Sequence, residues 1–204
     1  MTGQVLADRF GFDAGAGKWM KRAGMIALGV ALMWASAKIK VAIEPVPVTM
    51  QTLVVMAIGL AYGARMGAAT MFAYLALGAA GEPVFAGTPE KGIGLGYMLG
   101  STGGYLAGFV AAAGLVGWLA ERGWDRTVLT TAGAMAAGLA ALYACGVAWL
   151  AFGFPLTAFG SAFSGIGVEK ALAFGVMPFL WIDALKLCLA VVAFPLIWRL
   201  LGRS

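Results

Sequence analysis

The 204-residue sequence contains no histidine, only two cysteines and few charged residues, which make up 11% of the chain. The absence of histidine argues against a zinc site, a haem, a Cys–His nucleophile and a Ser–His–Asp triad. Cys145 and Cys188 both fall inside apolar runs, where a cysteine usually packs as a small hydrophobic residue, although a disulfide between them stays open. The sequence therefore predicts no catalytic residue, no metal site and no cofactor.

Nucleotide-binding motifs are also missing. Gly17-Lys18 lacks the upstream glycine of a P-loop, and the glycines between Gly92 and Gly96 have the wrong spacing for a dinucleotide loop. A transport process that runs uphill would therefore need energy from an ion gradient or from another subunit.

Hydrophobic residues dominate what is present, at 62% of the chain with a mean hydropathy of +0.91. Soluble domains carry about 25% charged residues, more than twice the fraction found here. The net charge of +5 is spread over the loops between apolar runs, so it does not indicate a nucleic-acid partner. The composition predicts a protein that crosses the lipid bilayer several times.

The apolar runs predict an all-α membrane protein, a bundle of six transmembrane helices with long structured extracellular loops. The expected spans are residues 23–37, 52–63, 68–80, 102–119, 128–152 and 178–200. The second and third are short against the ~20 residues that a spanning helix needs, so they are expected to tilt or to cross only in part. Residues 1–19 are expected to form a cytoplasmic N-terminal tail, and residues 20–204 a single membrane domain.

The basic residues predict that both termini are cytoplasmic, because inner loops carry an excess of Lys and Arg. Nine basic residues then lie inside: Arg9, Lys18, Lys21, Arg22, Arg65, Arg122, Arg126, Arg199 and Arg203. Four lie outside: Lys38, Lys40, Lys91 and Lys170.

Three outer segments have distinct patterns. Residues 38–49 alternate apolar and polar residues and contain two prolines, which predicts an extended, non-helical segment. Residues 81–101 form a long loop rich in glycine and proline, and loops of this length are often functional. Residues 163–176 are expected to form a short helix in a third outer loop.

Polar residues inside or beside the spans are the candidate ligand groups. Asp183 and Lys186 lie three residues apart on the last span, so on a helix they share a face, about 7 and 12 Å from its start at Pro178. An acid and a base at that depth are costly and usually mark a substrate or ion site, although a structural ion pair stays open. Thr49 and Gln51 precede the second span and could bind a ligand or cap the helix.

Small residues repeat every four positions on two spans. Ala27, Ala31 and Ala35 form a stripe on one face of the first span, which would allow a helix of this chain or of a partner to approach closely. Glycines 96, 100, 104 and 108 form a similar repeat leading into the fourth span.

Four segments resemble the signature segments of the BioY family. These are residues 45–52, PVPVTMQT; residues 81–87, GEPVFAG; residues 100–109, GSTGGYLAGF; and the Pro-Phe-Leu-x-x-Asp-x-x-Lys pattern of residues 178–186. The four segments occur in order across most of the chain. Their combination is specific for the family, whereas one segment alone would not be. The sequence departs from the family at Ser101, where proline is usual, and at Trp181-Ile182, where a Pro-Gly pair is common.

The resemblance implies the biotin-binding S component of an energy-coupling factor transporter, located in the bacterial cytoplasmic membrane. It implies that Asp183 and Lys186 contact biotin, that aromatic residues form an apolar wall, and that further residues line the site. The resemblance itself assigns Asp183 and Lys186. The chemistry of biotin adds Phe85, Tyr97, Tyr105 and Trp181 as candidates for the apolar wall, and the further candidate contacts are Gln51, Thr49, Gly87, Gly100 and Thr102. A transmembrane coupling subunit (T) with two ATPase subunits is the implied partner, docked through Ala27, Ala31 and Ala35. Function as a homo-oligomer without these subunits stays open.

Two other functions remain compatible with the residues. The chain could be a stand-alone, proton-coupled transporter of small molecules with Asp183 as the coupling carboxylate. It could instead be a membrane scaffold in which Asp183 and Lys186 only hold helices together. An enzyme is disfavoured, because one Asp–Lys pair without a second acid, a histidine or a metal offers little catalytic machinery.

Overall fold

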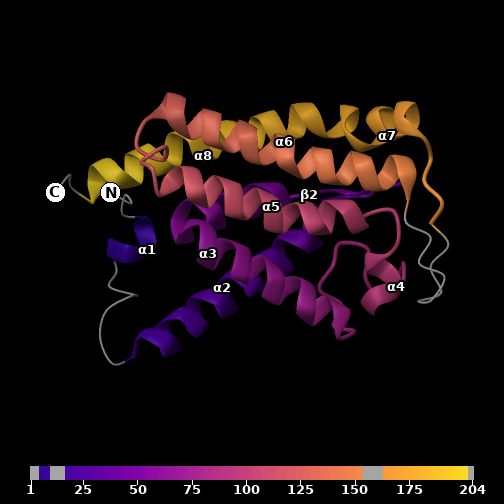
Figure 1. Cartoon of the computed structure of the whole chain (residues 1–204), viewed down its shortest axis with the longest axis horizontal. Helices are drawn as coiled ribbons and strands as arrows, with labels where there is room; N and C mark the ends of the chain where they lie inside the picture. The colour runs from indigo at the N-terminus through magenta and orange to yellow at the C-terminus, as the bar shows by residue number, and fades with distance from the viewer. Residues whose placement is uncertain (1–4, 10–16, 154–162, 202–204) are drawn as a thin grey trace.

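The computed structural model describes residues 5–9, 17–153 and 163–201, which form an all-α helical bundle with one small two-stranded hairpin (Figure 1). The helices are α1 Leu6–Arg9, α2 Lys18–Lys38, α3 Gln51–Ala79, α4 Gly94–Met98, α5 Gly103–Ala120, α6 Val128–Phe152, α7 Val168–Gly175 and α8 Met177–Leu200. The strands β1 Lys40–Val41 and β2 Val48–Thr49 pair antiparallel, with Lys40 opposite Thr49.

The element α3 contains two helices that fold back on each other at Gly63. Gly63 has φ +78°, a conformation that glycine adopts without a steric penalty. The side chain of Gln51 donates a hydrogen bond to Tyr74, 23 positions further on, at 2.8 Å. A straight helix would separate them by about 35 Å. The predicted turn between the second and third spans is therefore confirmed, and each half is shorter than the ~20 residues of a full span.

Within the described ranges, four helical segments are long and apolar enough to cross a membrane, judged by length and composition. They are Gln51–Ala79, Gly103–Ala120, Val128–Phe152 and Val168–Leu200. The expected fourth, fifth and sixth spans agree with α5, α6 and α8 to within one residue at each end. The last segment combines α8 with α7, the short helix predicted in the third outer loop.

Helix α5 lies at the centre of the bundle, packed between α3 and α6 (Figure 1). Lipid provides no hydrophobic force between helices, so close packing of small residues has to hold them together. At Gly108 a side chain would come within 3.0 Å of the Leu142 backbone oxygen, and Gly104 lies still more tightly against Trp149. The glycine repeat thus predicts this contact correctly at positions 104 and 108. Gly96 precedes α5 and a side chain there would meet nothing within 4 Å, so the prediction is wrong at this position. Gly100 also precedes α5, and its carbonyl oxygen accepts a hydrogen bond from Trp149 of α6 at 2.9 Å.

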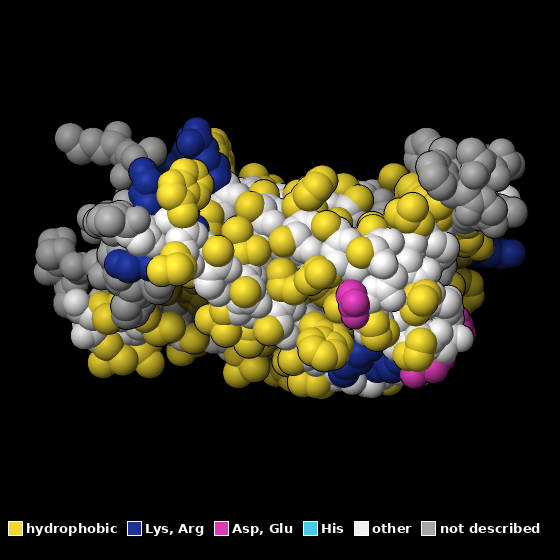
Figure 2. Space-filling view, turned by 90° about the horizontal axis from the view of Figure 1, so that it is seen from below, with side chains coloured by type: hydrophobic (Ala, Val, Ile, Leu, Met, Phe, Trp, Pro, Cys, Tyr) yellow, Lys and Arg dark blue, Asp and Glu magenta, His cyan; other side chains and the backbone are white. Residues whose placement is uncertain are grey.

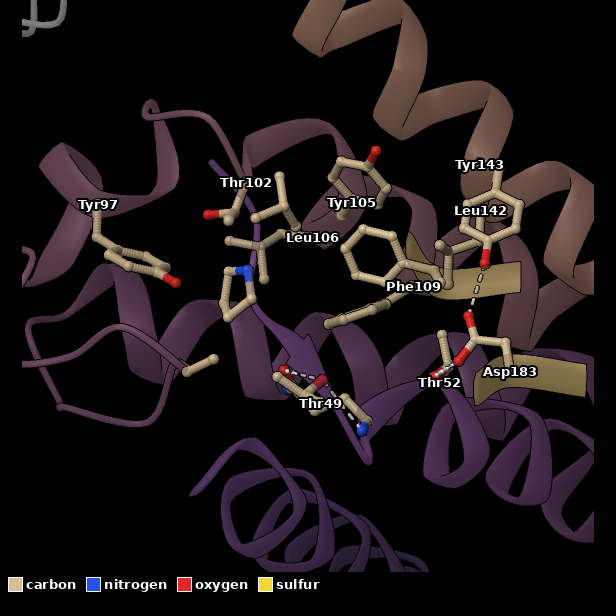
Figure 3. A pocket seen from close by; sticks show the side chains of 15 residues that line it. Thr49, Thr52, Tyr97, Thr102, Tyr105, Leu106, Phe109, Leu142, Tyr143 and Asp183 are labelled. Atoms are coloured by element: carbon tan, nitrogen blue, oxygen red, sulfur yellow. Dashed lines mark hydrogen bonds between the residues drawn. The ribbon is translucent and has the colours of Figure 1, made fainter. Parts of the chain in front are cut away.

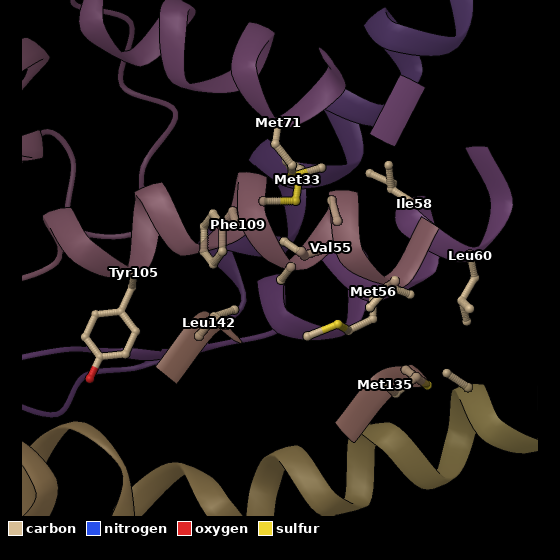
Figure 4. Packing of buried hydrophobic residues seen from close by; sticks show 14 of the residues in the cluster. Met33, Val55, Met56, Ile58, Leu60, Met71, Tyr105, Phe109, Met135 and Leu142 are labelled. Atoms are coloured by element: carbon tan, nitrogen blue, oxygen red, sulfur yellow. The ribbon is translucent and has the colours of Figure 1, made fainter. Parts of the chain in front are cut away.

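The core between these helices is filled by large flexible and aromatic side chains (Figure 4). Met33 from α2, Met56 and Met71 from α3, and Met135 from α6 are all fully buried, and Phe109 from α5 lies among them. Methionine adapts its shape to irregular gaps, which suits the place where α5 crosses the two halves of α3.

The two cysteines are free: Cys145 is half-buried, and Cys188 is exposed rather than packed inside as expected.

The connections gather at two opposite ends. The extended segment predicted for residues 38–49 is confirmed as the β1–β2 hairpin, and it lies with α4 and the start of α8 at one end. The α5–α6 loop and the end of α8 lie at the other end, where Asp125 contacts Trp198. Val5 and Leu6 of the N-terminal segment are buried at that end, with Val5 beside Gly63. Figure 2 shows Lys and Arg side chains at the left end, and both acidic and basic side chains at the right.

Candidate functional site

Asp183 is the centre of a buried polar cluster formed by three helices. Its side chain is 1% exposed, and Lys186, one turn further along α8, donates a hydrogen bond to Oδ1 at 2.7 Å. Thr52 of α3 also donates to Oδ1, at 2.8 Å, and Tyr143 of α6 donates to Oδ2, at 2.7 Å. These donors satisfy a carboxyl group that would be costly to bury without hydrogen-bond partners.

The ammonium group of Lys186 lies behind this carboxylate. Besides Asp183 it contacts the Thr49 carbonyl oxygen at 2.6 Å and Thr52 Oγ1 at 3.0 Å. An ammonium group has three N–H donors, so these three acceptors use its full capacity. Lys186 thereby connects α8 to the end of the β1–β2 hairpin and the start of α3.

A cavity of about 520 Å³ opens beside Asp183 and extends toward α4 (Figure 3). Its apolar lining comprises Val46, Pro47, Ala86, Leu106, Phe109, Leu142 and Phe179. Its polar lining comprises Thr49, Gln51, Thr52, Tyr97, Thr102, Tyr105, Tyr143 and Asp183.

The two ends of the cavity differ in their chemistry, as Figure 3 shows. Asp183, Thr52 and Tyr143 form one end, where Oδ2 has a single recorded donor among the described residues. A carboxylate oxygen can accept two hydrogen bonds, so it has room for a ligand N–H group. Tyr97 and Thr102 form the other end. The Tyr97 oxygen accepts the Gly87 N–H at 3.1 Å, which leaves its own proton available to a ligand acceptor.

The β1–β2 hairpin and the residue 81–101 loop contribute Val46, Pro47 and Ala86 to the lining of this cavity and are held in place by lysine side chains. Lys38, at the end of α2, donates to the carbonyl oxygens of Pro83, Phe85 and Thr88 at 2.8 to 3.1 Å. Lys91 forms an ion pair with Glu44 at 2.5 Å, which joins the residue 81–101 loop to the hairpin.

Ser101 adds a second link, because its hydroxyl donates to the Pro45 carbonyl oxygen at 2.9 Å. The serine at this departure from the family pattern thus joins the same two loops.

The structure brings most of the predicted ligand residues together. Thr49, Gln51, Tyr97, Thr102, Tyr105 and Asp183 line the cavity, and Lys186 supports it from behind. Phe85 lies one layer further out, fully buried, and its ring stacks on Tyr97 with centroids 5.2 Å apart. Gly87 contacts Tyr97, and Gly100 lines a neighbouring cavity that shares Tyr97 and Thr102.

Trp181 is the predicted residue that the structure does not bring to the cavity. Its side chain is 85% exposed on the outside of α8. Residues two apart on a helix point in nearly opposite directions, so a helix that turns Asp183 inward turns Trp181 outward. Phe179, four residues before Asp183, lies on the same face instead and lines the cavity.

Two residues of the polar cluster were not predicted as ligand residues. The sequence marks Thr52 only as a polar residue at the start of a span, and it assigns no role to Tyr143. A signal for Tyr143 does exist, since it is the only tyrosine in the apolar run that forms α6. A buried tyrosine hydroxyl usually requires a hydrogen-bond partner.

The alanine stripe lies away from this site. Ala27, Ala31 and Ala35 are exposed on α2, whereas Gly29 and Met33 on the opposite face are buried. Ala27 and Ala31 line an apolar groove of about 1,370 Å³ between α2 and the second half of α3. Packing within the described part of this chain therefore does not explain the stripe.

Comparisons with known proteins agree on one family. The profile of the BioY family matches residues 9–203. A probable biotin transporter BioY from Pyrococcus horikoshii is 36% identical over 172 residues, which cover 84% of this chain and 93% of that protein. The biotin transporter BioY of Thermotoga maritima is 35% identical over 162 residues, covering 79% and 86%.

A similar fold is found in the crystal structure of the S-component for biotin from an ECF-type ABC transporter. The TM-score is 0.65 at 21% identity, over 90% of this chain and 94% of that one. At this identity the likeness concerns the fold.

Proposed function

Because this chain belongs to the BioY family of biotin transporters, and not to an enzyme family, we propose that it captures biotin as the substrate-binding subunit of an ECF-type transporter. The observation that supports this function best is the cavity beside Asp183, which has two polar ends and an apolar middle. Biotin has the same sequence of groups: a ureido ring, an apolar thiophane ring and alkyl chain, and a carboxylate.

The ureido end of biotin suits the Asp183 end of the cavity. Ureido N–H groups are donors, and Asp183 Oδ2 can accept one besides the hydroxyl of Tyr143. A carboxylate ligand would be repelled there, since like charges at close range are unfavourable. Leu106 and Phe109 would then contact the thiophane ring.

The carboxylate of biotin suits the opposite end, where Tyr97 and Thr102 offer hydroxyl groups. The resemblance implied that Lys186 contacts biotin and left open which end of the ligand it meets. Because its three N–H groups contact Thr49, Thr52 and Asp183, we assign Lys186 to holding the ureido-binding acceptors in place.

In the membrane we propose six spans, counting α2 and the two halves of α3 separately together with α5, α6 and α8. Both termini then lie in the cytoplasm, and the biotin cavity opens outward beneath the hairpin and the residue 81–101 loop. Basic residues favour this orientation, because Arg122, Arg126 and Arg199 lie at the opposite end from the cavity. The protein would be located in the cytoplasmic membrane.

The proposed partners are a transmembrane coupling subunit and two ATPase subunits, which would supply the energy that this chain has no motif to provide. The exposed stripe of Ala27, Ala31 and Ala35 beside an apolar groove supports docking of partner helices there. Small residues let helix backbones approach closely in lipid, where packing rather than the hydrophobic effect drives association.

Direct titration of the purified protein with biotin in detergent tests this function. We expect tight binding by the unmodified protein and loss of binding in Lys186→Ala, because the acceptors Asp183 and Thr49 lose their common donor. Lys170→Ala is the matched control: it removes the same charge from an exposed position on α7 and should bind like the unmodified protein.

Absence of biotin binding by the folded, unmodified protein would contradict the proposed function. Retained tight binding in Lys186→Ala would contradict only the role of Lys186 and leave biotin as the ligand.

A further inference from the structure

The neighbouring cavity adjoins the biotin cavity at the end away from Asp183 (Figure 3). It is lined by Pro45, Pro47, Lys91, Gly96, Tyr97, Gly100, Ser101 and Thr102. Pro47, Tyr97 and Thr102 line both cavities, so the two adjoin at the hydroxyl groups proposed for the carboxylate of biotin. Among the described residues of the second lining, Lys91 is the charged one.

The side chain of Lys91 lies close to the hydroxyl group of Tyr97. A side chain at Gly87 would begin 3.1 Å from the Tyr97 oxygen and 3.2 Å from Lys91 Cδ, so both groups border the same small space. Backbone groups hold this arrangement, because the Lys91 N–H donates to the Gly87 carbonyl oxygen at 2.7 Å and the Gly87 N–H donates to the Tyr97 oxygen. The ammonium group, on its flexible stem, can therefore reach a ligand that contacts Tyr97.

Lys91 has donor capacity left for such a ligand. Among the described residues its ammonium group has one recorded partner, the Glu44 carboxylate in the ion pair at 2.5 Å. An ammonium group has three N–H donors, so it can take a further acceptor without breaking this pair. The Glu44 and Lys91 side chains are 78% and 46% exposed, and a pair this exposed is weak, so a ligand carboxylate can also compete with Glu44.

Two further lysines at this end are committed to contacts within the protein. Lys38 donates to three carbonyl oxygens of the residue 81–101 loop, which use its full donor capacity. Lys40 donates to the Ala86 carbonyl oxygen and lies 3.8 Å from Glu90. Within the described ranges neither side chain lines the biotin cavity or its neighbour, so neither is placed to meet a ligand carboxylate.

We propose that Lys91 binds the carboxylate of biotin together with Tyr97 and Thr102, and that it makes the site select the acid over its uncharged amide. This inference rests on the proposed function and adds a cation at the carboxylate end of the ligand. Hydroxyl groups donate to a carboxylate and to an amide oxygen alike, whereas an ammonium group adds a charge-assisted hydrogen bond to the carboxylate. The orientation of biotin is then fixed at both ends, with its ureido N–H groups toward Asp183 and its carboxylate toward Lys91.

Titration of the detergent-purified protein with biotin and with biotinamide, its uncharged carboxamide, tests this role. We expect the unmodified protein to bind biotin more tightly than biotinamide. Lys91→Gln should weaken biotin binding about fivefold, the upper range for a partly exposed ion pair, and leave biotinamide binding unchanged. Lys170→Gln is the matched control: it removes the same charge from an exposed position on α7 and should change neither affinity.

Glu44→Gln separates the charge of Lys91 from its structural contact. This variant removes the same ion pair between the hairpin and the residue 81–101 loop, but it keeps the ammonium group and removes the acid that competes with the ligand. We therefore expect Glu44→Gln to bind biotin at least as tightly as the unmodified protein. Lys91→Arg should keep the preference for biotin over biotinamide, because it keeps the charge.

Three results would overturn this role of Lys91. Unchanged biotin affinity in Lys91→Gln, or an equal loss of affinity for biotin and biotinamide, would show that Lys91 does not meet the carboxylate. A loss in Glu44→Gln as large as that in Lys91→Gln would show that the ion pair only holds the two loops together. These results would leave biotin capture intact, whereas absence of biotin binding by the folded, unmodified protein would contradict the proposed function and this inference with it.

Discussion

The described part of the chain buries two carboxylates, Asp183 and Asp125, at opposite ends of the bundle. Both accept a hydrogen bond from an aromatic side chain and pair with a cation: Asp183 with Tyr143 and Lys186, Asp125 with Trp198 and Arg126. They differ in their surroundings. Asp183 lies inside the helical bundle with a cavity beside it, whereas Asp125 lies in a connecting loop.

The difference indicates that Asp183 is placed to bind a ligand, whereas Asp125 holds a connecting loop against the end of α8. The Asp183 pair is almost completely buried on both sides, and its carboxylate faces the cavity. The Asp125 pair exposes 37% of the arginine side chain. A buried pair costs several kcal/mol when one partner is removed, whereas a partly exposed pair contributes about 1 kcal/mol or less. Substitutions at the two ends should therefore have unequal effects.

The largest effect is expected from Lys186→Met, which keeps an unbranched side chain, one heavy atom shorter, and removes its charge. Asp183 then remains as a buried charge without its cation, and the free energy of unfolding should fall by about 3–5 kcal/mol. Biotin binding should be lost as well. Chemical denaturation in detergent, followed by circular dichroism, measures the first effect.

The double variant Asp183→Leu/Lys186→Met serves as the control for this prediction. Replacing a whole buried pair by apolar residues is often neutral or stabilising, so we expect the stability to return while biotin binding stays absent. If the double variant is as unstable as the single one, the unpaired charge of Asp183 is not the cause of the instability. The proposed difference between the Asp183 and Asp125 pairs would then be wrong.

A smaller effect is expected from Tyr143→Phe, which removes one hydrogen bond to Asp183 Oδ2 and keeps the ring. A hydrogen bond to a charged group contributes about 1.5 kcal/mol or more, so biotin affinity should fall about tenfold. Tyr62→Phe is the control, because the Tyr62 hydroxyl contacts the Met25 carbonyl oxygen away from the cavity. Equal affinities in both variants would show that Tyr143 does not orient the carboxylate for biotin.

The smallest effect is expected from Asp125→Asn. The amide oxygen can still accept the hydrogen bond from Trp198, and only the partly exposed contact with Arg126 is weakened. We expect a loss of about 1 kcal/mol in unfolding free energy and no change in biotin affinity. A large loss of biotin affinity, measured by the same titration, would show that the two ends are coupled and would remove the distinction between them.

The span boundaries could be predicted closely because they follow from local properties of the chain. Residues 128–152 form one apolar run between a polar loop and a Gly-Phe-Pro segment, and α6 covers the same residues. Pro178 predicts a helix start because its missing N–H is not needed there, and α8 begins at Met177. The reversal at Gly63 was signalled by two glycines within five residues.

The candidate site was predicted only in part. The pairing of Asp183 with Lys186 follows from their spacing on one helix, and the structure confirms it. The contacts of Asp183 with Thr52 and Tyr143 join residues 131 and 40 positions apart, which no local pattern reveals. Trp181 was predicted as a ligand residue from its type alone, although the rotation of α8 turns it outward.

The sequence by itself determined which segments are helices, where they end, and which residues carry charge inside the apolar runs. Each of these depends on hydrophobicity, proline and glycine within a few neighbouring positions. The tertiary structure decided how each helix is rotated about its axis, and so which side chains meet at the cavity. In a soluble helix the polar face reveals that rotation, but here lipid-facing and core-facing residues are both apolar, so only the packing of the helices against one another determines it.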